Sequence, residues 1–196
     1  MAVTARQTDR IQAIWDDHIN VANKARRELA SAVSTAIDSI ALSLQAGGQL
    51  LIAGNGGSAA DAQHIAAELT GRFLRERQPL RALPLHGNTS ALTAIGNDYG
   101  YDRVFARELT AHARPGDTFL AISTSGNSAN ILQAIDAARQ CNVTVIGLTG
   151  QSGGKMRAMC DLCVCVPSES TARIQEMHIT IGHAICELLE ERLTDA

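Results

Sequence analysis

The feature that most constrains the fold is a regular alternation of short apolar runs and longer amphipathic stretches, which starts after Gly47-Gly48. The apolar runs predict five strands, at residues 49–54, 80–85, 118–123, 143–148 and 161–166. Helical patterns separate or follow them, at 58–73, 88–97, 101–113, 127–141 and 171–192. Strands that alternate with helices pair in parallel and are covered on both faces. The pattern therefore predicts an α/β fold with a doubly wound, parallel five-stranded sheet flanked by helices.

Residues 1–46 precede this alternation and contain neither glycine nor proline. Their apolar residues recur at helical spacing in two stripes. The stripes are Ile11, Ile14, Trp15, Ile19 and Ala22, and then Leu29, Val33, Ile37, Ile40 and Leu44. We expect one single domain, 1–196, in which 1–46 form one long or two consecutive helices for oligomer contacts and 47–196 form the ligand-binding core.

Composition narrows the function and the compartment. The net charge is -3 and no basic run exists, which argues against direct nucleic-acid binding. No stretch approaches the ~20 apolar residues of a membrane span, and the charged N-terminus is unlike a signal peptide. An odd number of cysteines, five, then predicts free thiols and a cytoplasmic protein. We expect Cys160, Cys163 and Cys165 to pack in the core rather than hold a metal.

Two polar loops follow predicted strands, at residues 54–61 (GNGGSAAD) and 123–128 (STSGNS). Ligands of parallel sheets bind at the carboxyl ends of strands. Glycines let backbone N–H groups approach an anion, Ser58 is a candidate N-cap, and clustered hydroxyls donate to phosphate oxygens. A nucleotide fingerprint lacks its acidic residue after the next strand, and no lysine supplies a P-loop. A tight turn without a ligand remains the alternative for the first loop.

Candidate catalytic or metal-binding side chains lie on two helices. His64 and Glu68 are four residues apart and share a helix face, which suits a metal site but also many solvent-exposed pairs. The last helix carries Gln175, His178 and His183. Gln175 and His183 are separated by ~12 Å along a straight helix, a long span for two ligands of one ion. His178 could equally be a core or interface histidine.

Four segments in the expected order resemble the signatures of the phosphoheptose isomerases, which are SIS-domain proteins. The segments are residues 53–64 (AGNGGSAADAQH), 92–99 (LTAIGNDY), 122–128 (ISTSGNS) and 172–178 (ARIQEMH), the last followed by His183. The resemblance implies a SIS-domain fold whose core, 47–196, binds a sugar phosphate. It implies isomerisation of D-sedoheptulose 7-phosphate to D-glycero-D-manno-heptose 7-phosphate, the first step of ADP/GDP-heptose synthesis and of lipopolysaccharide heptose.

The same resemblance assigns site residues and an assembly. Its implied substrate contacts are Asn55, Gly56, Gly57, Glu68, Asn97, Asp98, Ser123, Thr124, Ser125, Ser128 and Gln175. Its implied zinc ligands, for one ion per subunit, are His64, Glu68, Gln175 and His183. It implies that Glu68 and His183 carry the proton transfers, and that the protein is a homotetramer with active sites at subunit contacts.

The chemistry of these side chains agrees with an enediol-type proton transfer. Glu68 and His183 supply a carboxylate and an imidazole, either of which can donate or accept a proton near neutral pH. The chain has only two lysines, Lys24 and Lys155, and neither lies in a motif, which argues against a Schiff-base route. The alternative is a non-catalytic regulator that binds the replication initiator DnaA, similar to DiaA. That regulator lacks the acid and the histidine that match Glu68 and His183, and both are present here.

Overall fold

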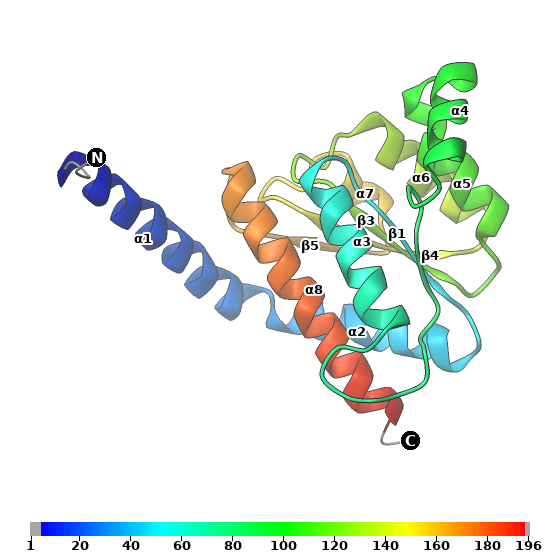
Figure 1. The fold of residues 1–196 in the computed structure, drawn as a ribbon, viewed down its shortest axis with the longest axis horizontal. Helices are drawn as coiled ribbons and strands as arrows, with labels where there is room; N and C mark the ends of the chain where they lie inside the picture. Colours follow the sequence, from blue (N-terminus) through cyan, green and yellow to red (C-terminus); the bar gives the residue numbers. More distant parts are fainter. Residues whose placement is uncertain (1–4, 195–196) are drawn as a thin grey trace.

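A computed structural model describes residues 5–194 and confirms the predicted architecture (Figure 1). The helices are α1 (Ala5–Glu28), α2 (Ala30–Gln45), α3 (Gly57–Thr70), α4 (Thr89–Tyr99), α5 (Val104–His112), α6 (Ala129–Gln140), α7 (Met156–Met159) and α8 (Thr171–Thr194), with a short 3-10 helix at Tyr101–Arg103. The strands are β1 (Leu50–Ala53), β2 (Ala82–Pro84), β3 (Thr118–Ile122), β4 (Thr144–Thr149) and β5 (Leu162–Cys165).

All strand pairs of the sheet are parallel, and the spatial order is β2-β1-β3-β4-β5. The chain moves outward from β1 to β2, and then returns to the other side of β1 to form β3. This reversal makes β1 and β3 the topological switch point, where α/β sheets bind ligands. Ala53 pairs with Ala121 at the carboxyl ends of these strands, so both polar loops leave the sheet at the switch point.

Alternate residues of the strands face two separate cores. Ile52, Leu120 and Ile146 pack with α2, α3 and α8 on one face, whereas Leu51 and Phe119 pack with α4, α5 and α6 on the other. The central strands are buried on both faces, which explains why their sequences are continuous apolar runs rather than alternating ones. The helices α3 and α8, which carry the histidines, therefore share one layer.

The N-terminal region forms two consecutive helices that part at Leu29, one of the two predicted forms. α2 packs its second stripe into the core through Ile37 and Ile40. α1 projects away from the body of the domain (Figure 1). Its stripe, Ile11, Ile14, Trp15 and Ile19, stays 43–62% exposed. These four residues therefore have no use in the core of their own chain, whereas Ala22 at the end of the stripe packs against it.

Two local predictions were wrong. Ser58 does not cap α3, because the helix begins at Gly57 and Gly56 occupies the cap with a φ of 55°. The helix expected at 88–97 ends later, since α4 continues to Tyr99 and the chain turns at Gly100, whose φ is 91°. The five cysteines are free, as predicted. Within residues 5–194, no helix has the length and apolar character needed to cross a membrane.

Candidate active site

The first loop folds back closely on the start of α3 at the end of β1. A Cβ on Gly54 would lie 2.4 Å from the carbonyl oxygen of Ser58, so only glycine fits there. The positive φ of Gly56 likewise favours glycine. Gly56 and Gly57 are exposed, whereas Ser58 is buried. The exposed glycines thus leave room for an anion at the N-terminus of α3, where helices bind anions, although the N–H groups of Ser58 and Ala59 already donate to the carbonyls of Asn55 and Gly56.

The second loop gathers its hydroxyls at the end of β3. Ser123 Oγ lies 3.0 Å from Ser128 Oγ and 3.5 Å from Ser125 Oγ. The backbone N–H of Asn127 donates to Ser125 Oγ at 3.2 Å. The loop itself is fixed from outside, because the backbone N–H of Lys155 donates to Asn127 Oδ1. Three of the predicted hydroxyls therefore meet in one cluster, which leads directly into α6.

Asn130, which was not among the predicted site residues, joins the two loops. It is 3% exposed and exchanges two side-chain hydrogen bonds with Asn55, at 2.8 and 2.9 Å. The hydroxyl of Tyr101 also donates to Asn55 Oδ1, at 3.3 Å. Asn55, predicted as a substrate contact, is thus oriented by two residues from distant segments. The only sign of Asn130 in the sequence is its position, since it is an asparagine in the first helical turn after the serine loop.

His64 and His183 meet between α3 and α8. Their Nε2 atoms are 3.0 Å apart, and the rings contact edge to face. Glu68 Oε1 lies 3.5 Å from His64 Nε2. The ring of Phe73 stacks on His183, with centroids 5.6 Å apart and planes at 14°. The fold therefore assembles both predicted proton-transfer residues around His64, although 115 positions separate Glu68 from His183.

Asp61 adds a buried carboxylate to this face of α3. It is 9% exposed, and its Oδ2 atom is buried without a hydrogen-bond partner. Burial raises the pKa of Asp61, and the charges of His64 and His183 partly oppose that rise. An unpaired buried oxygen near two imidazoles marks this region as polar and incompletely satisfied within the chain.

Gln175 lies beside the glycine loop and not beside the histidine pair. An ideal Cβ on Gly57 would stand 1.5 Å from Gln175 Nε2, so the amide occupies the space that glycine leaves free. Gly57 and His64 are two turns apart on α3, as Gln175 and His183 are on α8. The structure therefore brings His64, Glu68 and His183 together, and it places Gln175 at the anion-binding end.

The remaining predicted residues lie elsewhere. Asn97 and Asp98 are exposed, hydrogen-bonded to each other at 2.8 Å, and belong to α4 on the opposite face of the sheet. His178 is fully buried, where its Nε2–H donates to the Thr149 carbonyl at 3.2 Å. Burial lowers the pKa of His178 to about 4. It is the core histidine that the sequence left as one of two alternatives.

The donor set partly matches zinc. Two imidazole nitrogens bound to tetrahedral zinc at about 2.0–2.1 Å are about 3.3 Å apart, close to the 3.0 Å between His64 and His183. Glu68 offers an oxygen beside them. Among residues 5–194, however, no group of three or more His, Cys, Asp or Glu side chains gathers at metal-binding distances. The two imidazole nitrogens are spaced as they would be around one ion, whereas Glu68 lies 3.5 Å from His64 and the amide of Gln175 lies at Gly57.

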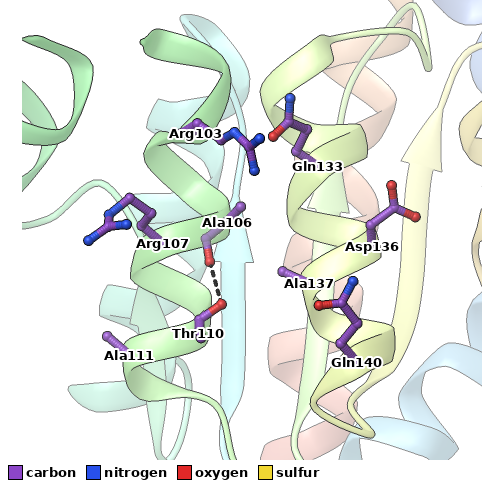
Figure 2. A pocket seen from close by; sticks show the side chains of 9 residues that line it. All are labelled: Arg103, Ala106, Arg107, Thr110, Ala111, Gln133, Asp136, Ala137 and Gln140. Carbon is purple, nitrogen blue, oxygen red and sulfur yellow. Dashed lines mark hydrogen bonds between the residues drawn. The ribbon is translucent and has the colours of Figure 1, made fainter. Parts of the chain in front are cut away.

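A hollow of about 710 Å³ lies between α5 and α6, away from all these residues (Figure 2). Arg103 and Arg107 stand on one side of it, and Gln133, Asp136 and Gln140 stand on the other. Their mixed charge and exposure are those of an ordinary groove between surface helices. No residue predicted from the sequence as part of the site lines it.

Comparison with known proteins agrees with this geometry. A family model described as "SIS domain" matches residues 15–150. The phosphoheptose isomerase of Rhodospirillum rubrum is 58% identical over 166 residues, which cover 85% of this chain and 88% of that protein. The solved phosphoheptose isomerase of Neisseria gonorrhoeae is 44% identical, with a TM-score of 0.89 over 94% of this chain and 98% of the other. That of Francisella tularensis is 36% identical, with a TM-score of 0.92 over 96% and 100%. The chain therefore belongs to the SIS-domain proteins and, among them, to the phosphoheptose isomerase family.

Proposed function

We propose that the protein isomerises D-sedoheptulose 7-phosphate to D-glycero-D-manno-heptose 7-phosphate by enediol-type proton transfer. The observation that carries the proposal is the meeting of Glu68, His64 and His183 on the same layer as the glycine loop, in a chain that belongs to the phosphoheptose isomerases. The loops bind the phosphate end of the substrate. The imidazole and carboxylate groups lie further along α3 and α8, where the sugar end would extend.

The reaction moves a proton between C1 and C2 and exchanges protons on two oxygens. Glu68, which is half-buried beside His64, and His183 carry these proton transfers. Positioned acids and bases of this kind contribute about 10²–10⁴-fold to the rate. Asn55 is held rigidly by Asn130 and Tyr101, so its position for a substrate contact is set before binding. Such preorganisation lowers the ordering cost of binding.

We also propose one zinc ion per subunit, held by His64, Glu68, Gln175 and His183, for which the amide of Gln175 would have to leave its place at Gly57. The mixed nitrogen and oxygen set suits zinc, with glutamine as a weak, neutral ligand. When bound, zinc polarises a carbonyl and stabilises the negative charge that develops on its oxygen. The protein residues still select the substrate, align it and move its protons.

The test is turnover of sedoheptulose 7-phosphate by the purified chain, with and without added zinc, followed by NMR. Glu68→Gln and His183→Ala should each lower kcat by about 100-fold or more while the fold is retained. A matched control exists on α5, where His112 and Glu108 have the same spacing and the same 3.5 Å separation as His64 and Glu68. Glu108→Gln and His112→Ala should leave kcat within about twofold of wild type, because this pair lies on α5, on the opposite face of the sheet from the site.

Wild-type protein without turnover in either condition would contradict the proposal. Specific binding to DnaA by such an inactive protein would support the alternative of a DiaA-like regulator. Turnover by Glu68→Gln above a tenth of the wild-type rate would leave the isomerase function standing, but it would contradict the role of Glu68.

We further propose a cytoplasmic homotetramer. The free thiols favour a reducing compartment. The exposed α1 stripe, and an apolar groove of about 480 Å³ between α1, α2 and α8, support burial of these helices against other subunits. Each Å² of apolar surface removed from water contributes about 25 cal/mol.

A further inference from the structure

The segment between α3 and β2 has no regular secondary structure, yet it is held firmly to α8. Glu190 of α8 accepts hydrogen bonds from three successive backbone N–H groups, those of Phe73, Leu74 and Arg75, at 2.7, 2.7 and 3.0 Å. A carboxylate that accepts several backbone N–H groups is a strong, charge-assisted anchor. The start of this segment is therefore fixed relative to α8.

Arg77 completes the anchor from the other side. Its Nε lies 3.1 Å from Glu190 Oε1, and both side chains are nearly inaccessible, at 2% and 1% exposure. Its guanidinium also donates to the carbonyls of Leu69, at 2.7 Å, and Glu68, at 2.8 Å. Arg77 thus binds carbonyls of the last turn of α3, where the Leu69 carbonyl also accepts from the backbone N–H of Leu80 at 2.9 Å. One buried ion pair connects α3, α8 and the loop, and we call Glu190 and Arg77 the latch.

The latch determines where the ring of Phe73 lies. The backbone N–H of Phe73 is bonded to Glu190, two helical turns beyond His183, and its ring stacks on the imidazole of His183. A flat ring at 5.6 Å and 14° restricts rotation of the imidazole about χ2. It keeps Nε2 directed at His64 and covers one face of the imidazole. A side chain misplaced by about 1 Å can cost a reaction about 100-fold.

We propose that Phe73, held by the latch, is a positioning residue that fixes the imidazole plane of His183 during isomerisation. The expected effect on kcat rests on the proposed function, whereas the fixed orientation of the imidazole rests on the geometry alone. Phe73→Leu keeps an apolar side chain but removes the flat face. It should lower kcat by about tenfold or more and change KM by less than about threefold. Phe73→Tyr keeps the ring and should retain at least about a third of the wild-type kcat.

A matched control is Phe105→Leu, the same substitution in the core on the opposite face of the sheet. It should lower stability and leave kcat unchanged. Glu190→Gln should also lower kcat, because it weakens the contact that holds Phe73 in place. The double variant should cost little more than the larger single effect, since both act through one ring. Fully additive losses would overturn the role of the latch.

NMR of the histidine ring protons separates this proposal from the proposed function. Loss of the stacked ring in Phe73→Leu should shift the ring protons of His183 and leave those of His112 unchanged, whether or not the wild-type protein turns over sedoheptulose 7-phosphate. Unshifted His183 resonances, or a Phe73→Leu variant with wild-type kcat in an active enzyme, would overturn the proposal. An inactive wild-type enzyme with shifted resonances would overturn only the proposed function.

Discussion

The contact between Gly57 and Gln175 gives a sharp test of how the glycine loop and α8 cooperate. Gly57→Ala adds a single carbon at a position of ordinary backbone conformation, within the first turn of α3. The new Cβ would lie 1.5 Å from Gln175 Nε2, whereas ordinary contacts begin at 3.4 Å. The amide must therefore retreat by about 1.9 Å. Because the obstructing atom ends a flexible side chain, the backbone has no need to move.

The two consequences of this change oppose each other. Alanine favours a helix over glycine by up to about 1 kcal/mol, so the melting temperature should stay level or rise. The displaced amide leaves the place from which Gln175 would contact the substrate or an ion. We expect kcat/KM to fall by about 100-fold, or about 2.7 kcal/mol of transition-state stabilisation. Steady-state kinetics with sedoheptulose 7-phosphate and thermal unfolding measure the two effects separately.

Two further variants decide whether the loss acts through Gln175. In a Gln175→Ala background no amide remains to be displaced, so Gly57→Ala should cost less than about threefold. Gly96→Ala in α4 is the matched control, since its Cβ would meet its nearest neighbour at an ordinary 3.8 Å. A Gly57→Ala variant that keeps more than a third of the wild-type kcat/KM, or one whose full cost persists without Gln175, would refute a functional role for the Gln175 amide at Gly57.

Three other predictions concern the phosphate loop, the core and the assembly. Ser125→Ala or Ser128→Ala should raise KM for the phosphorylated substrate more than it lowers kcat, because phosphate contacts are shared by the ground and transition states; equal falls in kcat and kcat/KM would place these serines at the reacting carbons. Burial lowers the pKa of His178 from 6.5 to about 4, so between these pH values the unfolded chain binds the proton and the folded chain does not. The free energy of unfolding should therefore keep its full value above pH 6.5 and fall by up to about 3 kcal/mol toward pH 4. Urea unfolding of His178→Gln across this range should show a weaker dependence of that free energy on pH. An unchanged pH dependence would contradict the assignment. Trp15→Glu places a charge in the exposed α1 stripe and should reduce the molar mass measured by light scattering, whereas an unchanged tetramer, or a wild-type monomer, would show that this stripe serves no subunit contact.

Much of the architecture follows from local chemistry that a sequence displays directly. Continuous apolar runs between amphipathic stretches specify strands buried on both faces, and their number and order gave the five-stranded parallel sheet. Polar loops after β1 and β3 must then lie at one edge of that sheet, because parallel strands end together. The pairing of His64 with Glu68 follows from helical spacing alone. The prediction failed at single residues such as Ser58, where the positive φ of Gly56 started the helix one position early.

The tertiary structure decided which distant groups meet, since side-chain contacts across more than 100 positions leave no trace in local pattern. Packing of α3 beside α8 placed His183 against His64 and sent Gln175 to Gly57 instead. Other contacts of the fold buried His178 against β4, joined Asn130 of α6 to Asn55, and enclosed Glu190 with Arg77. In the sequence these are ordinary polar residues on helices and loops. Their roles arise because burial makes each unpaired polar group costly, so that only a fold which supplies the partner is stable.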